Sequence, residues 1–295
     1  MLGKAMPQLK IQENEPLSLH TSFHIGGPAR VLAYPGDTAE LSALVRFAKE
    51  NGMDLRILGG GTNLLVCDEG VDALVVRLPA QGQLALDGNT LFAGAGAGKA
   101  IAAQTAADAG LAGLESFHGI PGTVGGGVRM NAGAYGGETA QVVVRVTAMD
   151  ENGNIRLYER QSLDFGYRHS LFSERPELIV LSAEFALTPD DPEAIRERMR
   201  ELAGRRKEKQ PLEYPSAGSV FKRPEGYFAG RLIEDAGLKG YTVGGAQVSE
   251  KHAGFIINRG GATAKDVKAL VAHIQKTVYD AFGVSLHCEI EMWDK

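Results

Sequence analysis

The 295-residue chain contains only two cysteines, Cys67 and Cys288. Their spacing does not match any metal-binding motif, and nothing in the sequence gives them a reason to pair, so a disulfide framework is excluded. Thiols that stay unbridged suit a reducing compartment. We therefore expect a cytoplasmic protein that holds no structural metal.

Long apolar segments and an excess of positive charge are also missing. No apolar run approaches the length that crosses a bilayer, and the N-terminal stretch MLGKAMPQLKIQENEP lacks the apolar core of a signal peptide. The formal net charge is -5, which argues against nucleic acid or an anionic membrane as a partner. The basic run over residues 196–210 is interleaved with glutamates, as is typical of a solvated helix face.

The chain departs from two common nucleotide-binding motifs at specific positions. The dinucleotide fingerprint needs a third glycine where GGGTNL has Leu64 and GAGAGK has Lys99. The phosphate-loop motif needs glycine where the chain has Ala93, and serine or threonine where it has Ala100. Neither of the folds that carry these motifs is supported.

Glycine, by contrast, is abundant, with 38 residues, many of them in two clusters. The first cluster is LGGGTNLLV (58–66) and the second is GIPGTVGGGVRMNAGAYGGE (119–138). Clustered glycines allow either a tight chain connection or a row of bare amide groups around an anion such as phosphate. Two such clusters in one chain favour an extended nucleotide ligand.

Hydrophobic periodicity and turn residues predict an alternation of helices and strands. Helices are expected at 39–51, 99–110, 192–209, 228–236 and 264–281. Strands are expected at 55–58, 73–78, 90–97, 177–187, 253–258 and 284–293, and a hairpin over 142–160 turns at ENGN. The pattern indicates a mixed α+β protein.

Six segments, taken together and in order, resemble one enzyme family. They are HTSFHIGGPA (20–29), LGGGTNLLV (58–66), GIPGTVGGGVRMNAGAYGGE (119–138), FGYRHSLF (165–172), PSAGSVFKRP (215–224) and AGLKGYTVGGAQVSEKHAGFIIN (236–258). The family is the UDP-N-acetylenolpyruvoylglucosamine reductases, also called UDP-N-acetylmuramate dehydrogenases, which are flavoenzymes of bacterial peptidoglycan synthesis. The resemblance runs from about residue 17 to the C-terminus.

The resemblance implies an α+β fold of the vanillyl-alcohol-oxidase (PCMH) type, which binds FAD. It implies two FAD-binding subdomains, at 1–75 and 76–192, and a C-terminal substrate-binding domain at 193–295. FAD and NADPH are the expected cofactor and cosubstrate, with a UDP-sugar as the substrate. No insertion follows Arg168 before the 177–187 strand, so the chain is similar to the shorter subtype, which lacks a tyrosine loop.

The two glycine clusters match the segments that hold FAD in this family. Related oxidases often attach the flavin covalently through a histidine beside the first loop, where this chain has Thr62 and Asn63, so we expect noncovalent FAD. The expected cofactor-binding residues are Gly59, Gly60, Gly61, Thr62, Asn63, Gly119, Ile120, Pro121, Gly122, Thr123, Gly125, Gly126, Asn131, Ala132 and Gly133.

Two of the family's catalytic positions match clearly. The arginine of its Tyr-Arg motif is Arg168 in GYRHS, and its role would be to hold the substrate carboxylate and the developing enolate. The proton-donating serine of its Ala-Gly-Ser motif is Ser219 rather than Ser216. A serine beside glycine is ordinarily a turn residue, so only the motif supports this role.

The third catalytic position has two candidate residues. The family has a glutamate in a Leu-Glu-Pro-Glu motif, and this chain reads LHCEIE, so Glu289 matches while His287 and Cys288 depart from the motif. Glu291 is the competing choice. In a strand both carboxylates would lie on one face, so periodicity does not separate them.

Four further residues are candidates for binding the UDP diphosphate. They are Lys222, Arg223, Lys239 and His252, which lie in matched segments although most lysines are simply solvated. Two other functions stay open from the sequence. One is an oxidase of the same flavin superfamily, and the other is a nucleotide-binding module without catalytic activity.

Overall fold

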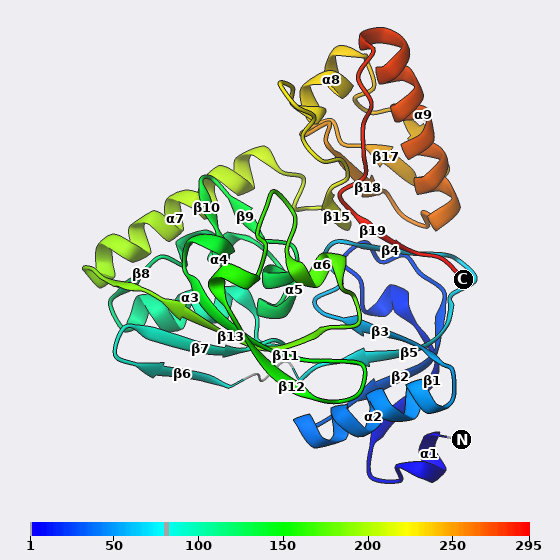
Figure 1. The fold of residues 1–295 in the computed structure, drawn as a ribbon. Coiled ribbons are helices and arrows are strands. Elements are labelled where there is room, and N and C mark those ends of the chain that lie inside the picture. The colour runs from blue at the N-terminus through cyan, green and yellow to red at the C-terminus, as the bar shows by residue number, and fades with distance from the viewer. Residues whose placement is uncertain (1, 80–82) are drawn as a thin grey trace. The chain divides into compact units, whose positions relative to one another are not determined.

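The computed structural model describes residues 2–79 and 83–295, which form two compact units (Figure 1). Unit 1 contains the chain up to Glu13, Val31–Gly60 and Ala73–Arg205. Unit 2 contains Asn14–Arg30, Gly61–Asp72 and Arg206–Lys295. Both units are therefore assembled from stretches that are distant in sequence. The division of this chain into three domains, with boundaries at 75/76 and 192/193, stays a prediction.

The N-terminal part of the chain forms a four-stranded sheet with strand order β1-β2-β5-β3. Its strands are β1 (Lys10–Pro16), β2 (Pro28–Tyr34), β5 (Val71–Arg77) and β3 (Asp54–Leu58). Helix α2 (Thr38–Glu50) buries Leu41 and Leu44 against the apolar side chains of this sheet. The helix starts where the Asp37 side chain accepts a hydrogen bond from the Glu40 amide at 2.8 Å, a typical N-cap. The helix predicted at 39–51 and the strand predicted at 55–58 are confirmed.

A second sheet of unit 1 has strand order β12-β11-β13-β7-β6 and is antiparallel throughout. Its strands are β6 (Leu84–Asp87), β7 (Thr90–Gly94), β11 (Val143–Met149), β12 (Ile155–Glu159) and β13 (Ile179–Ala186). The β11–β12 hairpin confirms the predicted turn, where the Asp150 side chain accepts hydrogen bonds from the amides of Asn152 and Asn154, both at 2.9 Å. Gly153 in this turn has φ +80°, which glycine adopts without strain.

Helices and short elements complete unit 1. The helices are α1 (Leu2–Ala5), α3 (Lys99–Asp108), α4 (Glu115–Gly119), α5 (Val124–Arg129), α6 (Leu171–Glu174) and α7 (Pro192–Lys209, which runs past the end of this unit). The short strands are β8 (Leu111–Ala112), β9 (Gly133–Ala134), β10 (Gly137–Glu138) and β14 (Thr188–Pro189), and the 3-10 turns are η2 (Thr139–Gln141) and η3 (Arg160–Ser162). The alanines of α3 let it pack closely on the core that Phe117 and Phe185 dominate. The helix predicted at 192–209 is confirmed as α7.

Unit 2 is built on the antiparallel sheet β15-β18-β17-β16. Its elements are η1 (Leu17–Leu19), β4 (Leu64–Val66), β15 (Ser216–Ser219), α8 (Ala229–Asp235), β16 (Thr242–Val243), β17 (Ala246–Val248), β18 (Phe255–Asn258), α9 (Ala264–Phe282) and β19 (Glu291–Trp293). Helix α9, orange to red in Figure 1, shares an apolar core with this sheet. A capping box between Thr263 and Asp266 starts α9, and Gly283 at φ +68° ends it. Helices α8 and α9 confirm the predicted helices.

The predicted strand at 284–293 is wrong in extent, since only Glu291–Trp293 forms a strand, β19. Before it the chain makes one isolated antiparallel bridge, Phe221 to Cys288. Leu286 and Ile290 are buried individually, and the Leu286 carbonyl accepts a hydrogen bond from Gln275 Nε2 at 2.9 Å. Alternating apolar residues are therefore buried here without a continuous partner strand.

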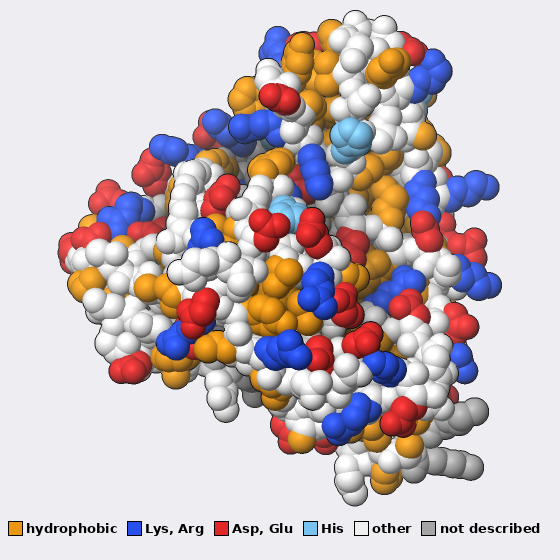
Figure 2. Space-filling view, in the orientation of Figure 1, with side chains coloured by type: hydrophobic (Ala, Val, Ile, Leu, Met, Phe, Trp, Pro, Cys, Tyr) orange, Lys and Arg blue, Asp and Glu red, His pale blue; other side chains and the backbone are white. Residues whose placement is uncertain are grey.

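The charged side chains of α7 form ion pairs, including Arg200 to Glu193 at 2.8 Å, as expected of a solvated helix. On the face drawn in Figure 2, acidic and basic side chains are interspersed. Within residues 2–79 and 83–295, no helix has the length and hydropathy needed to cross a membrane. Cys67 and Cys288 are both free thiols, as expected.

Candidate flavin and catalytic site

The two glycine clusters meet within unit 1. A Cβ atom added to Gly59, in the first loop, would lie 2.9 Å from Thr123 Oγ1, in the second loop. Real Cβ atoms essentially never approach other heavy atoms this closely, so a side chain here would force Thr123 to shift. The structure thus brings together two segments that are 64 positions apart (123 minus 59) and that the sequence assigns to the same ligand.

Gly61, which lies in unit 2, also has no room for a side chain. Its φ is +62°, and an added Cβ would lie 2.1 Å from the carbonyl oxygen of His20. The Gly61 carbonyl accepts a hydrogen bond from the Ser22 amide at 3.0 Å. The end of the first loop is therefore held against residues 20–22 with no room for a side chain.

The second loop is equally tight. An added Cβ on Gly125 would lie 2.8 Å from the Ala95 side chain, and the Gly122 carbonyl accepts a hydrogen bond from the Lys99 amide at 3.1 Å. Thr123 caps α5 by accepting a hydrogen bond from the Gly126 amide at 3.3 Å. The residues of this loop that are predicted to bind FAD carry no charge, and its glycines leave the main chain without side chains, which fits a segment where a cofactor contacts the backbone.

Asn131, Ala132 and Gly133 lie in the same cluster, after α5. Asn131 is 2% exposed and has φ +40°, a conformation that asparagine tolerates better than most residues. Its Nδ2 donates to Glu138 Oε2 at 3.1 Å and to the Gly166 carbonyl at 2.9 Å, and its Oδ1 accepts from the Ala140 amide at 2.9 Å. Both side-chain donors of Asn131 therefore bind other parts of unit 1. Contact with the cofactor stays a prediction.

Arg168 lies in unit 1, in the loop between η3 and α6. It is half-buried and has φ +53°, a left-handed conformation that costs a non-glycine residue about 1–2 kcal/mol. Its Nη2 donates to the Gly133 carbonyl at 3.1 Å, and its guanidinium lies 5.0 Å from the Tyr167 ring. Strain of this kind is frequent where a side chain must be aimed at a ligand.

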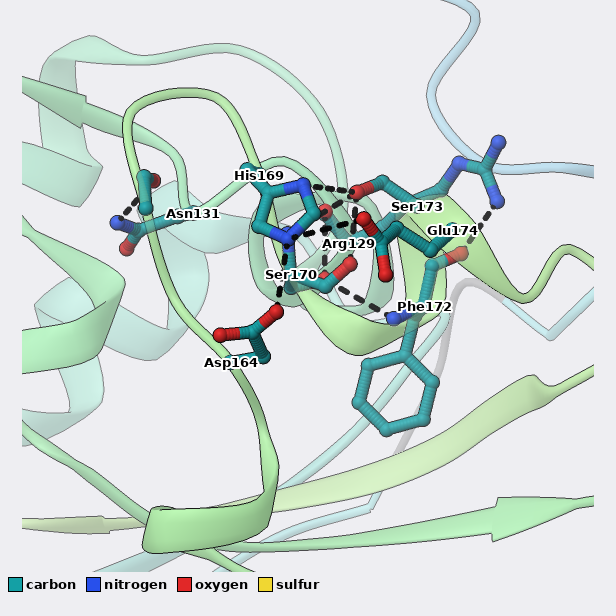
Figure 3. Close-up of polar contacts among 9 residues, drawn as sticks. Arg129, Asn131, Asp164, His169, Ser170, Phe172, Ser173 and Glu174 are labelled. Carbon is teal, nitrogen blue, oxygen red and sulfur yellow. Dashed lines mark hydrogen bonds and ion pairs between the residues drawn. The ribbon is translucent and has the colours of Figure 1, made fainter.

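His169, the next residue, forms a polar cluster that sequence reasoning missed (Figure 3). Its Nε2 lies 3.2 Å from Asp164 Oδ2 and 3.8 Å from Glu174 Oε1, and its Nδ1 lies 3.4 Å from Ser173 Oγ. The ligand atoms of Asp164, His169 and Glu174 are all within 4.8 Å of one another, close enough for a metal ion. Both carboxylates are exposed, and pairing with the imidazole accounts for their approach. The spacing of these residues in sequence carried no signal of the cluster.

In unit 2 the structure brings the segments of Ser219 and Glu289 together. The Glu289 amide donates to the Val220 carbonyl at 2.7 Å, and the Lys222 amide donates to the His287 carbonyl at 2.8 Å. Ser219 ends β15 directly after Gly218, whose φ is +80°. The predicted proton donor and the predicted acid thus lie on adjacent, hydrogen-bonded segments.

Ser216, by contrast, lies at the start of β15. Its carbonyl accepts a hydrogen bond from Ser22 Oγ at 2.6 Å, and it pairs with Ile257 in the sheet. These contacts fit a structural residue.

The structure also separates Glu289 from Glu291. Glu291 is exposed and lies in β19, where its Oε1 accepts from Trp293 Nε1 at 3.3 Å. Glu289 is half-buried and lies outside that strand, so the expectation that strand alternation puts both carboxylates on one face is wrong. Asn63 holds this segment, because its Nδ2 donates to the Glu289 carbonyl at 3.1 Å and its own carbonyl accepts from the Glu291 amide at 2.9 Å.

The four candidate diphosphate-binding residues all lie in unit 2. Lys222 and Arg223 are exposed, and the Arg223 guanidinium lies 4.4 Å from the Phe228 ring. Lys239 pairs with Glu234 at 2.8 Å. His252 Nδ1 accepts from the Gly254 amide at 3.1 Å, and burial lowers the pKa of its imidazole, with a further lowering by Lys239.

Comparisons with known proteins identify both parts of the chain. Residues 29–157 match the FAD binding domain family, and residues 210–293 match the family described as UDP-N-acetylenolpyruvoylglucosamine reductase, C-terminal domain. The UDP-N-acetylenolpyruvoylglucosamine reductase of Caldanaerobacter subterraneus subsp. tengcongensis is 50% identical over 99% of this chain and 96% of its own length. That of Agathobacter rectalis is 49% identical over 97% of this chain and 95% of its own length.

A solved structure agrees over the whole length. The crystal structure of UDP-N-acetylenolpyruvylglucosamine reductase (MurB) from Thermus caldophilus superimposes with a TM-score of 0.83 at 39% identity, covering 97% of this chain and 99% of that chain. The FAD-binding fold expected from the sequence is therefore confirmed. The chain belongs to the UDP-N-acetylenolpyruvoylglucosamine reductase family.

Proposed function

We propose that this protein reduces the enolpyruvyl group of UDP-N-acetylglucosamine enolpyruvate to give UDP-N-acetylmuramate, with NADPH as the hydride donor and noncovalent FAD as the cofactor. The observation that carries the proposal is the 50% identity to a reductase of this name over 99% of the chain. The product is a peptidoglycan precursor. The reaction belongs in the cytoplasm, where NADPH and nucleotide sugars are available.

The reaction adds one hydride and one proton across the vinyl double bond. FAD, which the two glycine loops would hold, would supply the hydride for the terminal vinyl carbon after its reduction by NADPH. The electron pair of the double bond then moves onto the adjacent carbon and its carboxylate, which gives an enolate. The chain must stabilise this charge and deliver a proton to that carbon.

We assign the stabilising role to Arg168 together with Glu289, whose carboxyl group can donate a hydrogen bond to the enolate only as the neutral acid. A guanidinium is permanently charged and can grip a carboxylate through two parallel hydrogen bonds. The strained backbone of Arg168 and its hydrogen bond to the Gly133 carbonyl support a fixed position for this group. Glu289 is held through its own main chain by Val220 and Asn63, so the backbone that carries its carboxyl group has a defined place.

We assign proton delivery to Ser219. Ser219 is half-buried and lies on the segment adjacent to Glu289. An enolate is basic enough to take a proton from a hydroxyl group that is positioned against it. Lys222 and Arg223, which follow in sequence and are exposed, are the proposed contacts of the UDP diphosphate, with Lys239 and His252 as a second pair.

Anaerobic stopped-flow absorbance tests the function directly. NADPH should bleach the flavin of the purified protein, and the enolpyruvyl UDP-sugar should restore its colour while mass spectrometry detects a product with two added hydrogen atoms. If oxygen restores the colour and the sugar does not, the protein is an oxidase of the same superfamily. If the protein binds no flavin, the reductase function is refuted.

The noncovalent state of FAD has a separate test. Acid precipitation should release all the flavin into the supernatant, because Thr62 and Asn63 cannot form the covalent bond that a histidine forms in related oxidases. Flavin that stays with the precipitated protein would contradict this assignment.

A further inference from the structure

Two segments of unit 1 are joined by a ladder of side-chain hydrogen bonds. One segment, residues 129–133, lies within the second glycine cluster, and the other, residues 166–172, carries Arg168. The rungs are Arg129 Nη1 to the Phe172 carbonyl at 2.7 Å, Ser170 Oγ to the Arg129 carbonyl at 2.7 Å, Asn131 Nδ2 to the Gly166 carbonyl at 2.9 Å and Arg168 Nη2 to the Gly133 carbonyl at 3.1 Å. Figure 3 shows several of these residues.

Asn131 has a special place in this ladder. It is buried, and its three side-chain hydrogen bonds reach three separate groups: the Glu138 carboxylate, the Ala140 amide and the Gly166 carbonyl. The Gly166 carbonyl also accepts from the His169 amide at 3.3 Å, so it closes the short turn in which Arg168 lies. Asn131 therefore holds the base of that turn.

The turn needs such support because its backbone is strained. Arg168 has φ +53° and Asp164, just before the turn, has φ +45°. A residue keeps an unfavourable conformation only when its surroundings fix it more strongly than the strain costs. Loss of the Asn131 hydrogen bond would let the turn relax and would move the guanidinium away from its place.

We propose that Asn131 is a positioning residue, which acts through the 166–169 turn to aim Arg168 at the substrate carboxylate. The inference rests on the proposed function, since it takes Arg168 as the group that stabilises the enolate. It differs from the role expected from the sequence, where Asn131 binds the cofactor. Both Nδ2 hydrogens already have acceptors in unit 1, so the side chain has no donor left for a ligand.

Two variants of Asn131 test this role in the holoenzyme. Asn131→Gly removes all three hydrogen bonds but tolerates the left-handed backbone. Asn131→Asp keeps the acceptor for Ala140 and loses both donors. In both variants we expect substrate to reoxidise the reduced flavin about 10- to 100-fold more slowly at saturation, with the half-saturating concentration changed by less than about 3-fold. Flavin content and the rate of NADPH reduction should stay within about 2-fold of wild type.

Thr139→Val is the matched control. Thr139 is fully buried, and its hydroxyl lies 3.1 Å from the Gly127 carbonyl and 3.0 Å from the Ala132 carbonyl, so these hydrogen bonds brace the same loop and neither of them joins it to the 166–172 segment. This variant should reoxidise at the wild-type rate, even if its unfolding temperature falls as much as that of Asn131→Gly. Equal slowing in Thr139→Val, or flavin loss in step with the slowing, would overturn the proposal.

A double-mutant cycle with Arg168→Lys shows whether Asn131 acts through the arginine. If it does, adding Asn131→Gly to Arg168→Lys should slow reoxidation by less than about 3-fold beyond Arg168→Lys alone. Losses that multiply in full would refute this route of action. Wild-type enzyme that substrate does not reoxidise at all would instead refute the proposed function, and the positioning role with it.

Discussion

Replacing Gly61 with alanine tests whether the first glycine loop must be bare. The added Cβ would lie 2.1 Å from the His20 carbonyl oxygen and 3.0 Å from Thr21 Cα, and the backbone has φ +62°. To restore an ordinary contact distance, residues 20–22 would have to move away from the loop by about 1 Å. That movement would break or stretch the hydrogen bond from the Ser22 amide to the Gly61 carbonyl, now 3.0 Å long.

The expected cost has two parts. The left-handed backbone costs alanine about 1–2 kcal/mol relative to glycine, and the lost hydrogen bond adds about 0.5–1.5 kcal/mol. The sum, about 1.5–3.5 kcal/mol, corresponds to a fall of several degrees in the unfolding temperature. FAD binding should weaken as well, because the loop that is predicted to contact the cofactor would be displaced.

Gly52→Ala is a control that separates the two parts. Gly52 has the same φ, +62°, but an added Cβ there meets nothing within 4 Å. It should therefore cost only the backbone part and leave FAD binding unchanged. The assays are thermal unfolding followed by circular dichroism and flavin content after gel filtration. If the two variants shift the unfolding temperature equally and both keep their flavin, the steric argument for Gly61 is refuted.

Three further predictions concern unit 2. Ser219→Ala should leave NADPH bleaching of the flavin intact but slow flavin reoxidation by substrate about 10²- to 10⁴-fold, while Ser216→Ala should behave as wild type. Equal slowing of flavin reduction and flavin reoxidation would show that Ser219 has a structural role and is not the proton donor. Glu289→Gln should slow reoxidation far more than Glu291→Gln, and the reverse order would transfer the role to Glu291. His252 has a lowered pKa in the folded protein, so the unfolded chain binds the proton first and stability should fall as the pH drops below about 6.5. His252→Gln should make the unfolding temperature less sensitive to pH between about 6.5 and 5, and an unchanged dependence would contradict the assignment.

The elements that were predicted well carry their signals locally. The helix at 264–282 has its capping box, its apolar stripe and its terminal glycine within its own sequence. The hairpin of β11 and β12 is specified by the turn residues between Asp150 and Asn154. Such elements can be predicted without knowing what they pack against.

The features that were missed depend on contacts between distant residues. The extent of β19 is set by pairing with β4, more than 200 positions earlier, and no local pattern reports that partner. The left-handed backbone of Arg168 lies in a turn whose Gly166 carbonyl is bound by Asn131, and Asn131 is 35 positions before Gly166 in the chain. The family motifs identified Arg168 and Asn131 as site residues, but they did not show that the two residues belong to hydrogen-bonded segments.

The pairing of β4 with β19 also has a consequence for biosynthesis. Leu65 and Val66 are fully buried in the folded chain, and Trp293, which pairs with Val66, is synthesised 227 residues later (293 minus 66). At roughly 5–20 residues per second, translation leaves this apolar strand without its partner for about 10–45 s. Strand β4, which follows the first glycine loop, must therefore be kept from aggregating in the nascent chain until translation is nearly complete. An enzyme truncated before β19 would expose β4 permanently.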